Sequence, residues 1–488
     1  MAGRSVSGVP VATPAPDLPA TLGALRATGH EARSVKDEIR VNLLAALRAG
    51  ADPWPGIVGF ESTVLPQLER ALIAGHDVVL LGERGQGKTR LLRSLVGLLD
   101  EWTPVIAGSE LGEHPYEPIT PASRRRAAEL GDELPVAWRH RDERYTEKLA
   151  TPDTAVADLI GDVDPVKVAE GRSLGDPETI HYGLVPRAHR GVVAINELPD
   201  LAERIQVALL NVMEERDIQV RGYTLRLPLD VLLVASANPE DYTNRGRIIT
   251  PLKDRFGAEV RTHYPLELGD EVALVRQEAR LRADVPAHLV EVVARLTRAL
   301  RESSAIDQGS GVSARFAVAA AETVAASALR RAAITGEEGA TARPVDLEAV
   351  PDVLRGKLEF ASGEEGRESE HLEHLLRRAT ADTARARLRG LDLTPLAEAV
   401  AESPVRTGER VPAAEVVRAL PQVPVLTEIA RRLGAAGTED PGPMASAAEL
   451  ALELLFLTRR LAKDTADDDT VSYGGAPGSP RRERPCGV

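Results

Sequence analysis

The residues best suited to chemistry lie in one short glycine-rich segment. Gly82, Gly87, Lys88 and Thr89 follow the spacing G-x-x-x-x-G-K-[ST], directly after the strand-like run DVVLL and directly before a helical pattern. Small residues let backbone N–H groups wrap a phosphate, and the following helix N-terminus adds partial positive charge. We therefore expect a nucleotide-phosphate site, with Lys88 on the β and γ phosphates and Thr89 on Mg²⁺. A glycine-rich turn without a ligand is the alternative. The candidate loop residues are Gly82, Glu83, Arg84, Gly85, Gln86, Gly87, Lys88 and Thr89.

A second polar pair closes a later strand. In GVVAINELPD an apolar run ends at Asn196 and Glu197. Enzymes with such a phosphate loop usually carry an acidic pair here, one carboxylate for Mg²⁺ and one to orient the attacking water. We expect Glu197 to orient water and Asn196 to occupy the metal position as a neutral amide that weakens metal binding. Asp200, one helical turn later, is a candidate replacement, and a plain strand end is the alternative.

Three further polar residues follow in chain order. Asn238 ends the apolar run VLLVASANP, which should lie beside the Glu197 strand, and it could hold the water or the γ-phosphate. Arg255, in PLKDRFG, has a position from which an exposed arginine can reach the nucleotide of a neighbouring subunit. Arg315, in GVSARF at a helix start, could close over the phosphates from a lid. Taken singly, each arginine is equally well explained as a surface residue.

The elements that must position these residues are those of an α/β fold. Short apolar runs alternate with helical periodicity between residues 21 and 265, which predicts a core with a parallel sheet. Residues 1–20 lack apolar periodicity and predict a disordered arm. Residues 103–150 show no clean period, so we expect short elements or a long surface loop there, within an insertion over about 103–190. A hairpin is predicted at 217–230.

Helical patterns dominate the remainder of the chain. No strand pattern is recognised after residue 266, so we predict a helical lid over 266–360 and a further helical region over 361–465. The tail at 466–488 is first acidic and then rich in Gly, Pro and Arg, which predicts disorder.

Composition narrows the classes of function. The 488 residues carry a net charge of −14, which argues against a constitutive nucleic-acid clamp. Cys486 is the single cysteine, so an internal disulfide and a thiolate zinc site are both excluded. Neither an export signal nor an apolar run of membrane-spanning length is recognised. We expect a cytoplasmic protein.

The order of these motifs resembles the AAA+ family over about residues 36–320. Within that family it is similar to the branch that contains the magnesium chelatase ATPase subunit and the MoxR-type ATPases. The resemblance implies the following roles: Ile57, Val58 and Gly59 beside the adenine, Gly82 to Thr89 as Walker A, Asn196 and Glu197 as Walker B, Asn238 as sensor 1, Arg255 as arginine finger and Arg315 as sensor 2.

Two segments carry the resemblance to the branch. TPDTAVADLIGDVDPVKVAEG at 151–171, followed by HYGLVPRAHRGVVAINEL at 181–198, resembles the chelatase insertion and its lead into Walker B. LLNVMEER at 209–216, with the hairpin after it, is closer to MoxR-type proteins. The chain departs from the family at Asn196, where Walker B usually has Asp, and nothing beyond about residue 360 matches the pattern.

The resemblance implies a motor that binds ATP and Mg²⁺, assembles as a hexameric ring and acts on a partner protein with a von Willebrand A-type domain. A MoxR-like chaperone is the first alternative. A sigma-54-type transcriptional activator is the second, although the Gly-Ala-Phe-Thr-Gly-Ala loop and the helix-turn-helix of that class are not found in the sequence. Neither a membrane nor a nucleic-acid partner is expected.

Overall fold

The chain divides into two compact units, Met1–His263 and Tyr264–Val488. The computed structural model describes residues 17–170, 177–215, 217–220, 223–239, 246–307, 311–364, 366–465 and 470–475.

The first unit is built on a five-stranded sheet with the strand order β11-β1-β10-β7-β4. Every neighbouring pair in it is parallel. Its strands are β1 (Val78–Leu81), β4 (Tyr145–Leu149), β7 (Gly191–Asn196), β10 (Val231–Ala237) and β11 (Ala258–Arg261). The predicted α/β core with a parallel sheet is therefore confirmed, and β10 lies beside β7 as expected.

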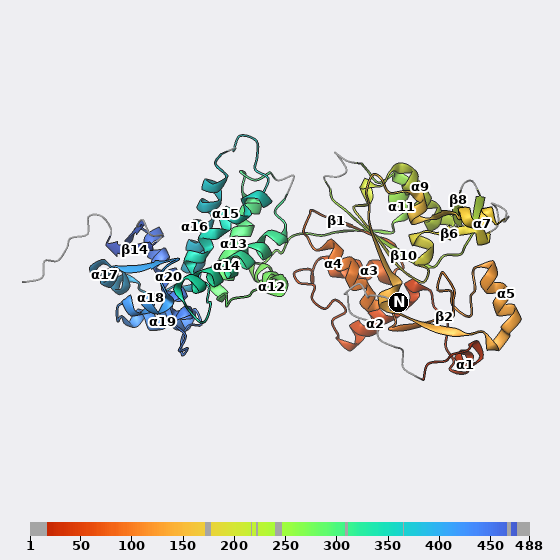
Figure 1. The fold of residues 1–488 in the computed structure, drawn as a ribbon, viewed down its shortest axis with the longest axis horizontal. Coiled ribbons are helices and arrows are strands. Elements are labelled where there is room, and N and C mark those ends of the chain that lie inside the picture. The colour runs from red at the N-terminus through yellow and green to blue at the C-terminus, as the bar shows by residue number, and fades with distance from the viewer. Residues whose placement is uncertain are drawn as a thin grey trace, which may run out of the picture. The chain divides into compact units, whose positions relative to one another are not determined.

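Both faces of this sheet are covered, because side chains alternate along each strand and both sets are apolar. Val78 and Leu80 pack into one cluster with α2 (Val35–Ala49), α3 (Val64–Ile73) and α4 (Lys88–Ser94). Val79 and Leu81 pack into a second cluster with α9 (Glu203–Glu215) and α11 (Thr250–Arg255). Figure 1 shows these two groups of helices on opposite sides of the sheet.

The expectation of an insertion over 103–190 is wrong for one element. Strand β4 belongs to the central sheet, where it pairs with β7 as the edge strand. Its sequence YTEKL escaped recognition because a half-exposed edge strand keeps polar residues and lacks the continuous apolar run of a buried parallel strand.

Around β4 the segment does consist of short elements. β2 pairs antiparallel with β3, β5 with β6, and β8 with β9, the last pair forming the predicted hairpin. The remaining elements of the unit are α1 (Leu22–Ala27), β2 (Trp102–Ile106), α5 (Pro121–Leu130), β3 (Val136–His140), α6 (Val156–Leu159), β5 (Gly161–Val163), α7 (Pro165–Ala169), β6 (Ile180–Tyr182), α8 (Leu184–Arg187), β8 (Asp217–Val220) and β9 (Tyr223–Arg226).

The second unit is mainly helical, with two apolar clusters. Its helices are α12 (Leu268–Glu278), α13 (Ala287–Glu302), α14 (Ala314–Thr335), α15 (Ala349–Leu354), α16 (Glu368–Arg387), α17 (Thr394–Glu402), α18 (Ala413–Ala419), α19 (Pro424–Arg432) and α20 (Pro441–Leu457). Among the helices described in either unit, none has the length and apolar character that crossing a membrane requires.

The second unit also contains a three-stranded antiparallel sheet, β12-β14-β13, which corrects the prediction that strands end at residue 266. The strands are β12 (Val405–Gly408), β13 (Leu461–Thr465) and β14 (Thr470–Gly475). Strand β14 also corrects the expectation of a disordered tail, for residues 470–475. These strands were missed because each buries only one or two large apolar side chains, such as Val471 and Tyr473, so no clear period develops.

Candidate nucleotide site

The glycine-rich loop joins β1 to α4 at the carboxyl edge of the parallel sheet, the edge where α/β proteins bind ligands. The Gly82 N–H donates to the Ala237 carbonyl of β10 over 3.1 Å. A Cβ on Gly82 would lie 2.0 Å from Thr262 Oγ1 and 2.3 Å from Gln86 Oε1, so no larger residue fits there. Gly87 caps α4 with φ +76°, a conformation that favours glycine. Both ends of the loop therefore depend on their glycines.

Lys88 and Asn238 meet inside this loop. The Lys88 side chain is buried, and its ammonium donates to the Gly82 and Glu83 carbonyls, the latter over 2.7 Å. It also donates to Asn238 Oδ1 over 2.8 Å. Asn238 directly follows β10, and the loop follows β1, so adjacent strands deliver the two side chains to one point. The structure thus brings together two residues that the sequence proposed separately.

The segment 57–59, expected beside the adenine, leads into a residue that lies next to the loop. The Phe60 ring is 4.0 Å from the place where a Gly87 Cβ would stand. Phe60 also packs edge-on against His263, with ring centroids 5.2 Å apart, and His263 in turn shares a 2.7 Å hydrogen bond with Thr63. Ile57, Val58 and Gly59 themselves are half-buried. The segment is therefore fixed against the phosphate loop.

Asn196 contacts a carboxylate that the sequence analysis did not single out. Its amide Nδ2 donates to Glu147 Oε1 over 2.7 Å, and its Oδ1 accepts from Ser236 Oγ over 3.1 Å. Glu147 lies on β4 and Asn196 at the end of the adjacent strand β7, on the face that α4 covers. The negative charge that Asn196 lacks is therefore present one hydrogen bond away.

Glu147 also ties the sheet to the phosphate-loop helix. Its carboxylate accepts two hydrogen bonds from Arg93 of α4, over 2.7 and 3.0 Å. Hydrogen bonding to Glu147 raises the pKa of Arg93. Since Arg93 lies four residues after Thr89, it stands about one helical turn further along α4. The pair could have been found from the sequence only by recognising β4 as a core strand.

Glu197 is held in an uncommon backbone conformation, with φ 57° and ψ 46°. Its N–H donates to Ser236 Oγ over 3.2 Å, so Ser236 positions both Asn196 and Glu197. The Glu197 carboxylate is half-exposed and makes no hydrogen bond or ion pair with any other described residue. Left-handed non-glycine residues concentrate at functional sites, where surrounding contacts hold the strain. The carboxylate is thus available to a ligand or a water molecule.

The remaining candidates lie on other elements. Arg255, on α11, forms a partly exposed ion pair with Glu214 of α9. Arg315 is exposed at the start of α14 in the second unit. Asp200 accompanies Glu197 through a backbone hydrogen bond of 2.9 Å, whereas Glu147 is the carboxylate that contacts Asn196.

The residues present fit a nucleotide triphosphate with its magnesium ion. The loop has no room for a Cβ at Gly82, its lysine ammonium is directed inward, and its backbone leads into the N-terminus of α4. Thr89, the second residue of that helix, is half-buried, so its hydroxyl can serve as the metal ligand that such loops provide.

Comparisons with known proteins agree with this geometry. The family described as the Sigma-54 interaction domain matches residues 171–255, which include Asn196, Glu197, Asn238 and Arg255. The magnesium-chelatase subunit ChlI of Nostoc sp. is 28% identical over 253 residues, covering 50% of this chain and 63% of that protein. Chloroplastic ChlI-2 of Arabidopsis thaliana is 27% identical over 333 residues, covering 63% and 75%. The chain is similar in sequence to AAA+ ATPases of the magnesium-chelatase type.

The similarity is one of sequence. A cryo-EM-based complex of magnesium-chelatase subunits BchI and BchD is 22% identical and covers 66% of this chain and 98% of that one, at the low TM-score of 0.34. The chain spans 60 to 63% of the length of the first curated relatives that it matches.

Proposed function

We propose that this AAA+ protein hydrolyses Mg-ATP as part of a ring, hexameric by analogy with its family, and uses the energy to remodel a partner protein. The observation that supports hydrolysis most directly is the arrangement around Lys88. The buried ammonium faces Asn238, and Glu197 presents an unpaired carboxylate at the end of the adjacent strand. Lys88 can neutralise phosphate charge, Asn238 can contact the γ-phosphate or the attacking water, and Glu197 can orient that water.

In this proposal each side chain has a separate task. When the nucleotide binds, the Lys88 ammonium donates to phosphate oxygens in place of the loop carbonyls, so its charge stays paired. Asn238 stays within hydrogen-bond reach of both lysine and phosphate. Glu197 accepts a proton from water, or orients it, with its backbone fixed through Ser236. Arg255 serves the nucleotide of the neighbouring subunit after it leaves Glu214, and Arg315 acts from the lid.

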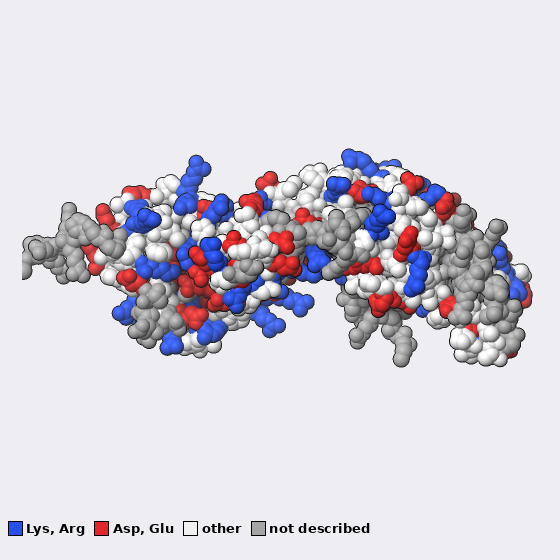
Figure 2. Space-filling model, turned by 90° about the horizontal axis from the view of Figure 1, so that it is seen from above, with Lys and Arg blue, Asp and Glu red and all other residues white. Residues whose placement is uncertain are grey.

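The proposed partner is a separate protein with a von Willebrand A-type domain, and the location is the cytoplasm. Similarity to ChlI proteins supports this class of machine over a MoxR-like chaperone, which remains the alternative. A nucleic-acid partner finds no support in the charge distribution, since acidic and basic side chains are mixed on the face drawn in Figure 2.

Two variants of the phosphate site test the proposal. Lys88→Ala removes a charged hydrogen-bond donor, which is worth about 1.5–3 kcal/mol and should weaken ATP binding roughly 10- to 100-fold. Glu197→Gln should keep ATP affinity but slow hydrolysis by about 10²-fold or more. Fluorescent-nucleotide titration and phosphate release measure the two effects, and Lys148→Ala on β4 is the matched control. Unchanged ATP affinity in Lys88→Ala would exclude this site.

A further inference from the structure

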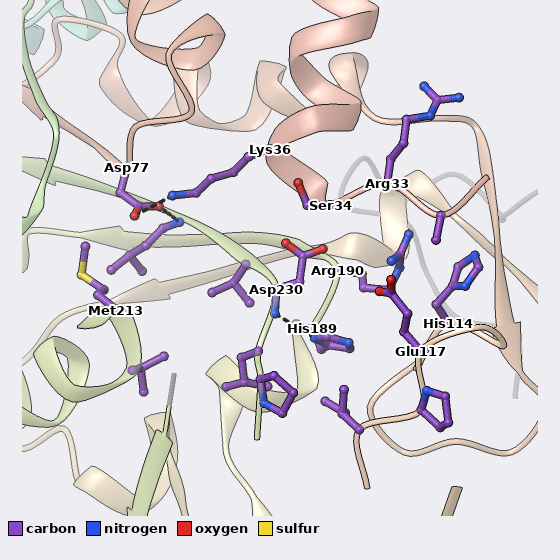
Figure 3. A pocket seen from close by; sticks show the side chains of 18 of the residues that line it. Arg33, Ser34, Lys36, Asp77, His114, Glu117, His189, Arg190, Met213 and Asp230 are labelled. Carbon is purple, nitrogen blue, oxygen red and sulfur yellow. Dashed lines mark hydrogen bonds and ion pairs between the residues drawn. The ribbon is translucent and has the colours of Figure 1, made fainter. Parts of the chain in front are cut away.

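A cavity of about 510 Å³ lies at the edge of the sheet opposite to the phosphate loop. Three of its lining residues, Asp77, Arg190 and Asp230, immediately precede β1, β7 and β10. The phosphate loop follows the other end of β1, so the two places are separated by the length of the strands, about 13 Å. Figure 3 shows the cavity with side chains contributed by several segments of the first unit.

Arg190 is the unusual member of this lining. The residue is 6% exposed, yet its buried Nε has no hydrogen-bond partner in the described structure. Burial lowers the pKa of its guanidinium. Buried polar groups are nearly always hydrogen-bonded, and buried charges are nearly always paired. A buried guanidinium nitrogen without a partner therefore points to a ligand.

In contrast to its side chain, the backbone of Arg190 is fixed by hydrogen bonds. Its φ is 60°, a strained conformation for any residue but glycine. Its N–H donates to the Asp230 carbonyl over 2.6 Å, and its carbonyl accepts from Arg144 Nε over 2.8 Å. Arg144 is itself fully buried in an ion pair with Glu38. The guanidinium is thus presented from a fixed base.

The acidic side chains of the lining are mostly engaged elsewhere. Asp77 pairs with Lys36 over 2.8 Å and accepts the Leu233 N–H over 2.9 Å. Asp230 accepts the Val35 N–H over 2.8 Å. Glu117 and Asp230 favour the charged form of Arg190 without a hydrogen bond to it that would satisfy Nε.

The remaining polar groups of the lining are neutral or positive. His114 and His189 are buried, and desolvation together with the Arg190 charge lowers the pKa of each to about 3. Both rings are therefore neutral at physiological pH. Arg33 and Arg124 add exposed positive charge at the lining. In the view of Figure 3, Arg190 lies between Asp230 and His114.

Another part of the lining is apolar. Ile119, Val212, Leu229 and Leu233 belong to the main core cluster of the unit and are 3 to 6% exposed. A cavity of this size with an apolar wall and a few convergent polar groups is typical of a small-molecule site. A bare inorganic anion would leave the apolar wall uncovered.

We propose that this cavity binds a small organic anion, whose carboxylate pairs with Arg190 and whose apolar body packs on the core wall. Guanidinium and carboxylate form paired, charge-assisted hydrogen bonds, which would satisfy the orphaned Nε. The site is separate from the nucleotide loop, so ATP binding provides an internal measure of folding.

The test is calorimetric titration of the full chain with octanoate, benzoate, the neutral amide benzamide and inorganic phosphate. At least one carboxylate should bind at one site per chain, and benzamide and phosphate should bind at least tenfold more weakly. Arg190→Met should weaken carboxylate binding at least tenfold, leave ATP affinity within twofold and keep or raise the melting temperature. Arg187→Met, which alters a nearby arginine outside the cavity, should change nothing.

Several results would overturn the proposal. These are carboxylate dissociation constants above about 10 mM in the unmodified protein, equal binding of benzamide or phosphate, or carboxylate binding that survives Arg190→Met. If Arg190→Met does not fold, Leu229→Phe decides, since it fills the cavity and keeps the arginine. Loss of carboxylate binding with retained ATP binding supports the site, and retained carboxylate binding overturns it.

Discussion

At the scale of single residues, Asn196 and Glu147 place the amide and the carboxylate in the opposite order from the one expected at a metal site. Where a carboxylate would hold the metal, this chain has an amide, and the carboxylate stands on the neighbouring strand, 2.7 Å away. Asn196→Asp alone would place two carboxylates at hydrogen-bond distance, and like charges at that distance raise the pKa of one of them. The amide and the carboxylate therefore have to be considered as one unit.

Exchanging the two groups gives a direct prediction. Asn196→Asp alone should lower the free energy of unfolding by about 1–3 kcal/mol without Mg²⁺, because the Glu147 carboxylate loses a donor and gains a repelling neighbour. Adding Glu147→Gln should restore the stability. The double variant should also reach half-maximal ATP hydrolysis at a lower Mg²⁺ concentration than the unmodified protein. Urea unfolding and the Mg²⁺ concentration for half-maximal turnover measure these effects. If the double variant is no more stable than Asn196→Asp and needs as much Mg²⁺, the two side chains do not act as an exchangeable pair.

The sequence predicted Lys88, Asn196, Glu197 and Asn238 because each ends or follows an apolar strand at a recognisable spacing. The residues that contact these side chains could not be predicted from the sequence. Glu147 lies 49 positions before Asn196 and acts through strand pairing, which no local pattern encodes. The pairing of Arg255 with Glu214 likewise depends on how α11 packs on α9.

At the scale of elements, a buried ion pair connects α2 to the central sheet. Arg144, just before β4, donates from both terminal nitrogens to Glu38 of α2, each over 2.7 Å. Glu38 also accepts the Asp100 N–H over 2.6 Å. Both charged side chains are almost fully buried. Such a pair is sensitive to removal of one partner, because the other charge is then left buried alone.

Breaking this pair should therefore destabilise the first unit. Glu38→Ala is expected to lower the free energy of unfolding by about 3–5 kcal/mol, whereas the double variant Glu38→Leu with Arg144→Met should lose clearly less. Chemical denaturation followed by circular dichroism measures both. Asp37→Ala, on the exposed side of the same helix, is the control. A double variant less stable than Glu38→Ala would mean that the pair contributes more than its own desolvation.

In the second unit, a buried histidine of α13 predicts a pH dependence. His288 shares a 3.0 Å hydrogen bond with Ser446 of α20, and burial lowers its pKa from 6.5 to about 3. Below pH 6.5 the unfolded chain therefore binds a proton that the folded chain does not. The free energy of unfolding should fall by about 1.4 kcal/mol per pH unit between pH 6.5 and 3, and be unaffected by this group above pH 6.5.

The histidine variant isolates this contribution. Between pH 7.5 and 5.0, the unmodified protein should lose about 2 kcal/mol more than His288→Gln, because the titration begins near pH 6.5. The exposed His374→Gln should show the full loss. Urea midpoints of the second unit at the two pH values give the comparison. Equal losses in His288→Gln and the unmodified protein would show that the ring is not held neutral.

Elements were predictable where apolar periodicity was strong and were missed where strands were short. The buried strands β1, β7 and β10 read as apolar runs, and the long helices α13 and α14 as amphipathic ones. The strands β12, β13 and β14 are assembled from segments up to 70 positions apart, from Val405 to Gly475, and each has too few apolar residues to be recognised alone. Their pairing is a property of the folded unit.

At the scale of the whole molecule, Arg255 is the residue through which hydrolysis should depend on assembly. In the single chain it is partly exposed and pairs with Glu214, which is a weak surface interaction in solvent. An arginine held this loosely can exchange Glu214 for a phosphate when another subunit's loop approaches, because the phosphate offers more charge and a drier site. Hydrolysis per chain should then rise with protein concentration, while ATP binding stays constant.

Mixing two inactive variants tests whether the site is shared between subunits. Arg255→Ala should bind ATP normally and lose hydrolysis by about 10³-fold, since arginines of this kind stabilise transition-state charge. Lys88→Ala should bind ATP roughly 10- to 100-fold more weakly. Together they should recover part of the activity, because some interfaces then combine an intact phosphate loop with an intact Arg255. Glu214→Gln is the matched control: it frees the arginine and should retain hydrolysis. If the two variants co-assemble on a sizing column and the mixture stays inactive, Arg255 does not act across subunits.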